Sequence, residues 1–125
     1  MNKTVLIIED DAILAEMYKD KFILSDFAVT IAIDGQKGLD LAMTSQPNLI
    51  ILDLALPKIK GTDILATLRE TNWGKSVPII VLTNLNVDGK ILEAITKYHP
   101  VYCLLKANIT PEEVVTKAKE VIKHE

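Results

Sequence analysis

Five short apolar runs recur at similar spacing along this 125-residue chain, and helix-like segments separate them. The runs cover residues 5–8, 28–33, 49–52, 77–82 and 101–105. These runs predict strands, and the run 49–52, bounded by turn residues, predicts a strand that is buried on both faces. Strands that alternate five times with helices run parallel and are joined by right-handed crossovers. The pattern therefore predicts an α/β fold, a doubly wound parallel sheet of five strands with five helices on its two faces.

The segments between the runs are expected to pack against the sheet through their apolar residues. These are Ile13, Leu14, Met17, Tyr18 and Phe22 in residues 12–23; Leu39, Ala42 and Met43 in residues 36–44; Ile64, Leu65 and Leu68 after Gly61; Ile91, Leu92 and Ile95 in residues 88–98; and Val114, Val115, Ala118, Val121 and Ile122 in the last helix. Thr110-Pro111-Glu112-Glu113 predicts the start of that helix, because it combines a capping box with a proline in the first turn.

The composition is typical of one soluble globular domain, which we expect to cover residues 1–125. A net charge of −3 gives no reason to expect direct binding to nucleic acid or to an anionic membrane. No apolar run is long enough to cross a bilayer, and the start has no signal-peptide layout, so a cytoplasmic protein is expected. The single Cys103 cannot form an internal disulfide. Because the sequence ends soon after the fifth helix, we expect no output domain.

The third apolar run leads directly into a carboxylate, Asp53. Ligands of open parallel α/β sheets bind at the carboxyl ends of the strands, so an acidic residue there has a reason to be functional. The alternative is that Asp53 only caps the loop that follows. Taken alone, this position does not decide between the two.

The first strand also ends in carboxylates, Glu9, Asp10 and Asp11. The first and third strands are plausible neighbours in a doubly wound sheet, which brings Glu9 and Asp10 beside Asp53. Three carboxylates in one site repel each other unless a cation holds them, and a hard divalent ion such as Mg²⁺ prefers oxygen ligands. Asp11 is expected in the first turn of the next helix, where the dipole favours negative charge.

A hydroxyl and an ammonium group follow two further strands. Thr83 comes after the fourth strand, and Lys106 comes after the fifth. Either residue alone is commonly just a surface residue. Together with the three carboxylates, each at the same end of its strand, they make a site suited to an aspartyl phosphate.

Over essentially its whole length the chain resembles a response-regulator receiver domain of two-component signalling. The residues that carry the resemblance are Glu9, Asp10, Asp53, Pro57, Gly61, Thr83 and Lys106. The resemblance implies a flavodoxin-like sheet with strand order 2-1-3-4-5. It also implies a phosphoacceptor signalling domain that catalyses only its own phosphorylation and dephosphorylation.

The resemblance further implies a role for each site residue. Asp53 accepts the phosphoryl group, while Glu9, Asp10, Asp53 and the backbone carbonyl of Ala55 bind Mg²⁺. Thr83 senses the phosphoryl group, and Lys106 pairs with it. The implied partners are a sensor histidine kinase or phosphotransfer protein as donor and an unidentified downstream protein, with a phosphorylation-dependent homodimer as a further outcome.

The sequence departs from the family pattern after the threonine, at Asn84, and around the lysine, at Cys103 and Ala107. Family members usually have a small residue, an aromatic residue and a proline at these places. The departures leave open a second function, a pseudo-receiver that binds partners without cycling phosphate. A phosphatase is a third alternative, disfavoured because Ala55 stands where a second acid is needed. The resemblance marks the positions of Ala55 and Leu85 as ones that tune hydrolysis of the acyl phosphate, and two apolar residues there predict slow hydrolysis because neither can orient water.

Overall fold

Five parallel strands form one sheet in the order β2-β1-β3-β4-β5, which confirms the predicted fold and strand order. The computed structural model of the chain describes residues 3–83 and 88–123. The strands are β1 (Thr4–Ile8), β2 (Ala28–Ala32), β3 (Leu49–Asp53), β4 (Ile79–Thr83) and β5 (Tyr102–Leu105). The helices are α1 (Ala12–Leu24), α2 (Gly35–Ser45), α3 (Gly61–Arg69), α4 (Gly89–Tyr98) and α5 (Pro111–Lys123), with a short 3₁₀ turn, η1 (Lys106–Asn108), after β5.

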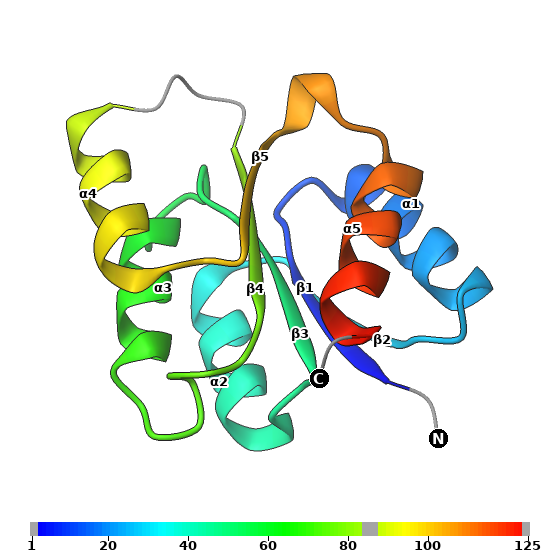
Figure 1. Cartoon of the computed structure of the whole chain (residues 1–125), viewed down its shortest axis with the longest axis horizontal. Coiled ribbons are helices and arrows are strands. Elements are labelled where there is room, and N and C mark those ends of the chain that lie inside the picture. The colour runs from blue at the N-terminus through cyan, green and yellow to red at the C-terminus, as the bar shows by residue number, and fades with distance from the viewer. Residues whose placement is uncertain (1–2, 84–87, 124–125) are drawn as a thin grey trace.

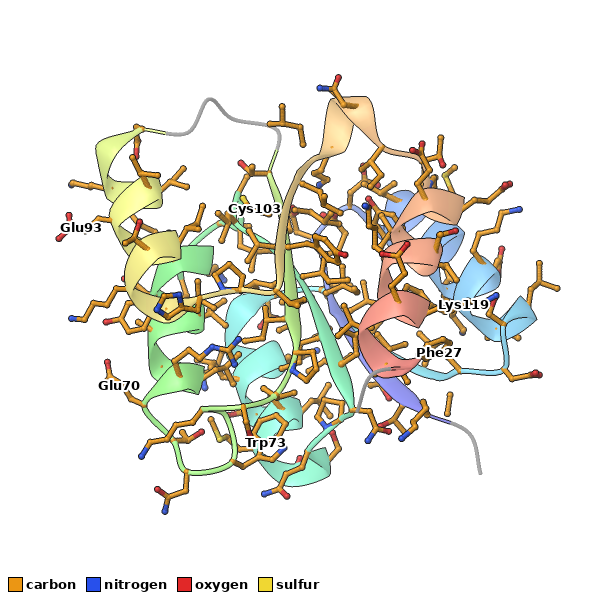
Figure 2. The ribbon with its side chains drawn as sticks, in the orientation of Figure 1. Phe27, Glu70, Trp73, Glu93, Cys103 and Lys119 are labelled. Atoms are coloured by element: carbon orange, nitrogen blue, oxygen red, sulfur yellow. The ribbon has the colours of Figure 1, made fainter. Side chains whose placement is uncertain are left out.

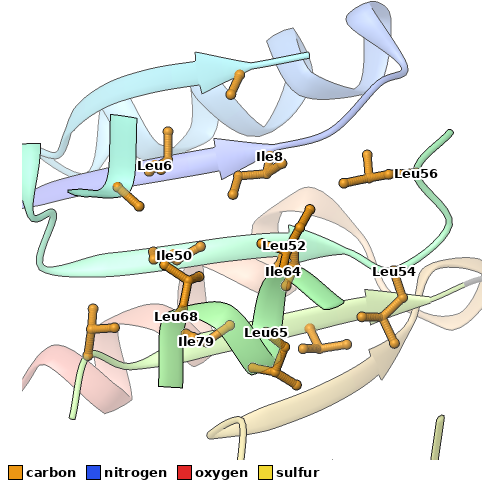
Figure 3. Packing of buried hydrophobic residues seen from close by; sticks show 14 of the residues in the cluster. Leu6, Ile8, Ile50, Leu52, Leu54, Leu56, Ile64, Leu65, Leu68 and Ile79 are labelled. Atoms are coloured by element: carbon orange, nitrogen blue, oxygen red, sulfur yellow. The ribbon is translucent and has the colours of Figure 1, made fainter. Parts of the chain in front are cut away.

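The helices cover the sheet in two layers. Helices α2, α3 and α4 lie on one face, and α1 and α5 lie on the other (Figure 1). Every residue of β3 is buried, as its apolar run predicted, and every residue of β4 is buried as well. Figure 3 shows part of the cluster on the first face, where strand residues such as Ile8 and Leu52 lie opposite Ile64 and Leu65 of α3. The buried residues of the two central strands thus fix the position of their carboxyl ends.

Two glycines let helices approach the sheet closely. A Cβ atom added at Gly38 of α2 would lie 2.7 Å from a side-chain carbon of Ile8. A Cβ added at Gly61, the first residue of α3, would lie 2.4 Å from the Cα of Leu54 and 2.7 Å from the carbonyl oxygen of Asp53. Glycine at position 61 therefore allows α3 to begin directly against the strand end that carries Asp53.

The starts of α5 and α1 can be compared with the sequence predictions. The backbone N–H of Thr110 donates to Glu113 Oε1 at 3.1 Å, and the N–H of Glu113 donates to Thr110 Oγ1 at 3.1 Å, which confirms the predicted capping box. Asp11 lies one position earlier than expected, as the N-cap of α1, where its carboxylate accepts from the N–H groups of Ile13 and Leu14. None of the described helices is long and apolar enough to cross a membrane.

Three apolar helix residues expected to be buried are instead exposed. The exposed fraction is 77% for Ile13, 48% for Met17 and 58% for Leu92. In α1 the prediction was right for Tyr18 and Phe22 but wrong for Ile13, because nine residues at about 100° each place Ile13 on the opposite side of the helix from Phe22. Leu92 faces outward because α4 packs mainly through its neighbour Ile91.

Candidate functional site

The ends of two neighbouring strands bring the three predicted carboxylates together. β1 and β3 are neighbours, with Ile8 opposite Leu52, so the residues that follow each strand meet at one edge of the sheet. Carboxylate oxygens of Glu9, Asp10 and Asp53 lie within 4.8 Å of one another. Glu9 and Asp53 are buried, and Asp10 is exposed. The clustering inferred from the strand order is therefore confirmed, and its exposed member gives the site contact with solvent.

Lys106 reaches this cluster from the far side of β4. Its Nζ lies 2.6 Å from Glu9 Oε1 and 3.1 Å from Asp53 Oδ2. Burial alone would lower the pKa of Lys106, but the carboxylates of Glu9 and Asp53 outweigh that effect and raise the pKa. One ammonium group thus contacts two buried carboxylates, and it remains charged at neutral pH.

Glu9 is the most perturbed acid of the site. Burial, with a further contribution from Asp53, raises its pKa to about 7, although Lys106 opposes the rise. Its Oε2 accepts the backbone N–H of Asp11 at 3.2 Å. Its Oε1 is buried and, among the described residues, accepts no hydrogen bond of regular geometry besides the ion pair with Lys106. A buried carboxylate oxygen that can still accept a ligand, beside two further carboxylates, fits a hard divalent cation.

Backbone groups hold Asp53 in place. The N–H of Ala55 donates to Asp53 Oδ1 at 2.9 Å, and the N–H of Leu54 donates to the carbonyl of Leu82 in β4 at 2.9 Å. In the register of β3 and β4, Asp53 lies opposite Leu82, so Thr83 comes one residue further toward the same edge. Thr83 is fully buried as the last residue of β4. The sequence thus correctly placed Asp53, Thr83 and Lys106 at one edge, and it missed the part that the Asp11 amide plays in holding Glu9.

Two of the three departures from the family pattern, Cys103 and Ala107, lie among the described residues. The Tyr102 hydroxyl donates to Glu120 Oε2 at 3.1 Å, and its ring packs with the cluster on the α1 and α5 face. Cys103 is exposed, and alternation along β5 directs it to the other face (Figure 2). No described peptide bond is cis, the bond before Ala107 included. Asn84 and Leu85 lie outside the described residues.

A doubly wound α/β sheet with an acidic cluster and a lysine at its carboxyl edge defines a class of small signalling domains. Residues 5–119 match the family model described as the response regulator receiver domain. Because the match covers most of the chain, the protein belongs to the response regulator receiver family. A receiver domain is a phosphoacceptor signalling module and not a true enzyme.

In most of the related proteins, the stretch that matches this chain is one part of a longer regulator. The chain is 37% identical over 81 residues to the DNA-binding dual master transcriptional regulator RpaA of Synechocystis, a stretch covering 65% of this chain and 34% of that protein. It is 28% identical over 89 residues to the polar-differentiation response regulator DivK of Brucella anthropi, covering 71% of this chain and 72% of that one. For most of the first relatives, the chain spans about a third of their length.

Solved structures share the fold. A CheY-like receiver domain protein from Methanospirillum hungatei JF-1 matches with a TM-score of 0.90 and 21% identity, over 99% of this chain and 96% of that one. The receiver domain of the sensor histidine kinase PA1611 from Pseudomonas aeruginosa PAO1 matches with a TM-score of 0.85 and 22% identity, over 98% and 99% of the two chains. The latter structure has a magnesium ion coordinated in its active site cleft.

Proposed function

We propose that Asp53 is the phosphoacceptor of this receiver domain and that a sensor histidine kinase or phosphotransfer protein is the donor. A carboxylate oxygen of Asp53 attacks the phosphorus atom, a P–O bond forms, and the P–N bond to the donor imidazole breaks, with its electron pair returning to the nitrogen. The observation that carries this proposal is the convergence of Asp53 with Glu9, Asp10 and Lys106 at one sheet edge. Asp53 is well placed as the nucleophile because the Ala55 amide fixes one of its oxygens.

The other site residues act on the charge of the transferred group. Mg²⁺, when bound by the carboxylates of Glu9, Asp10 and Asp53 and the carbonyl of Ala55, supplies positive charge beside the phosphoryl oxygens. The Lys106 ammonium, which pairs with Asp53 before the reaction, neutralises a further phosphoryl oxygen afterward. The Thr83 hydroxyl, at the end of β4, binds the phosphoryl group and so senses its presence.

The output on this proposal is a change in protein binding. Phosphorylation shifts the surface formed by α4, β5 and α5, which alters affinity for a downstream protein or favours a homodimer. Residues 1–125 act as one receiver domain in the cytoplasm. The name of the RpaA relative states that this longer protein binds DNA. We do not propose direct nucleic-acid binding for this chain, because its net charge is −3.

Mass spectrometry of the intact protein after treatment with acetyl phosphate tests the proposal. We expect one phosphoryl adduct that requires Mg²⁺, is absent in Asp53→Asn and persists in Asp63→Asn, which removes an exposed acid of α3. An adduct that persists in Asp53→Asn would show that the acceptor is wrongly assigned. No adduct in the wild type would favour the alternative, a pseudo-receiver that binds partners without cycling phosphate.

A further inference from the structure

Arg69 makes an unusual set of contacts away from the acidic site. Its Nε donates to the carbonyl of Tyr98 at 2.8 Å, and its Nη2 donates to the carbonyl of His99 at 3.1 Å. Its Nη1 donates to the carbonyls of Gly74 at 2.8 Å and Val77 at 2.6 Å. The side chain thus connects the end of α3, the loop before β4 and the end of α4.

The chemistry of these contacts requires arginine. The chain has 14 Lys and Arg residues, and Arg69 is its only arginine. A planar guanidinium offers a fixed fork of donors, whereas a lysine offers a single point charge. Arg69 is the last residue of α3, and its fork meets carbonyls at the C-terminal end of α4, so one cation complements the negative ends of two helix dipoles.

Toward its N-terminal end, α4 is attached mainly by one side chain. Ile91, in the first turn, is the one buried residue of this helix, while Ile95 and Tyr98, toward the other end, are partly buried. A cavity of about 690 Å³ lies between α3 and α4, where the small residues Ala66 and Ala94 are among its lining. A Cβ at Gly89, the first residue of α4, would meet nothing within 4 Å. Figure 1 shows α4 at the outer edge of its layer, beside α3.

We propose that α4 is hinged at its C-terminal end, with Arg69 as the pivot and the cavity as the space into which the helix turns. The movement of the helix on phosphorylation rests on the proposed function, because Thr83 senses the phosphoryl group and the chain continues from Thr83 to the N-terminal end of α4. The pivot rests on the Arg69 contacts alone. Two of the four carbonyls belong to the loop before β4 and two to the end of α4. Arg69 therefore ties the C-terminal turn of α4 to that loop, and this turn stays fixed while the first turns move.

Amide hydrogen exchange measured by NMR on the unmodified protein tests the pivot without any phosphoryl group. Helix ends ordinarily fray, so amides of the last turn should exchange at least as fast as those further in. We expect the reverse in α4: after correction for intrinsic rates, Tyr98 and His99 exchange about tenfold more slowly than Glu93 and Ala94. Equal or faster exchange at Tyr98 and His99 overturns the proposal.

Three variants assign this protection to the guanidinium fork. Arg69→Met should speed exchange at Tyr98 and His99 by about tenfold relative to Glu93 in the same protein, because charge-assisted bonds to their turn are lost. Arg69→Lys should lose most of the protection, since it keeps the charge but not the fork. Lys75→Met removes an exposed cation from the loop after α3 and should change nothing. If Arg69→Met does not fold, Arg69→Lys decides, and wild-type exchange in that variant overturns the proposal.

Beryllofluoride with Mg²⁺, which mimics a phosphoryl group, then tests the motion. In the wild type, amide shift changes should be largest at Gly89 and decline to none at Tyr98, whereas in Arg69→Lys they should extend to Tyr98. Equal changes along the whole wild-type helix overturn the hinge. If no amide shift changes in the acidic site, the result contradicts the proposed function and not the pivot. The exchange experiment still supports or overturns the pivot, so failure of the proposed function and failure of the pivot can be told apart.

Discussion

Replacing Glu9 by glutamine should stabilise the protein in the absence of divalent cations. Burial raises the pKa of Glu9 from 4.5 to about 7, so between these pH values the folded state holds a proton that the unfolded state has released. The free energy of unfolding therefore falls as pH rises through this window, and the loss is complete above the folded pKa. Glutamine cannot ionise and avoids the loss.

The magnitude follows from the shift and from the hydrogen bonds of the side chain. At about 1.4 kcal/mol per pKa unit, the ionised Glu9 costs the folded state about 3 kcal/mol above pH 7. Glutamine has one acceptor oxygen where Glu9 meets two donors, Lys106 Nζ and the Asp11 N–H, so one donor loses its partner at a cost of about 1 kcal/mol. We expect Glu9→Gln to raise the free energy of unfolding by about 2 kcal/mol.

Urea unfolding followed by circular dichroism, with a chelator present, measures this difference. The gain should be present at about pH 8 and should be lost as the pH falls to about 5, because the cost of the raised pKa has by then fallen to about 1 kcal/mol, which the lost hydrogen bond offsets. Glu16→Gln, which removes an exposed carboxylate of α1, should stay within about 0.5 kcal/mol of wild type at both pH values. A destabilised Glu9→Gln at the higher pH, or a gain that does not vary with pH, would refute the reasoning.

Three further predictions concern the metal, the lifetime and the packing of the site. Mg²⁺ should raise the melting temperature of the wild type but not of Asp10→Ala, since a ligand of the folded state stabilises it by mass action; an equal rise counts against the site. Ala55→Asn should speed the loss of phosphate from Asp53 by orienting water, and an unchanged decay rate contradicts the predicted slow hydrolysis. Gly61→Ala should lower the free energy of unfolding by about 1 to 3 kcal/mol or more, because its Cβ would overlap the neighbouring backbone. Gly89→Ala, whose Cβ would lie in open space, should not lower it. Similar urea midpoints for the two variants would contradict this prediction.

The sequence predicted the elements whose burial is set by local pattern. The run Leu49–Leu52 predicted a strand buried on both faces, and the position of Asp53, Thr83 and Lys106 after successive parallel strands placed them at one edge. The capping box at Thr110 is equally local, since its two hydrogen bonds join residues three apart.

Other features depend on contacts that no local pattern records. Which side of α1 is buried depends on how the helix lies against the sheet and α5, so the exposure of Ile13 and Met17 could not be inferred from apolar content alone. The partners of Arg69 are backbone carbonyls from two segments, the loop before β4 and the end of α4, and carbonyls carry no sequence signal. The one available hint was a single arginine at the end of a predicted helix in a chain otherwise rich in lysine.

Chemical mapping of the phosphorylated residue tests the central claim most directly. Borohydride reduces an aspartyl phosphate to homoserine, and tandem mass spectrometry of the digested protein then locates the modified position. After treatment with acetyl phosphate and Mg²⁺, the account predicts homoserine at position 53 and at no other acidic residue, and none when Mg²⁺ is withheld. Homoserine at another aspartate, or an adduct that yields none, would contradict the assignment of Asp53 as the phosphoacceptor.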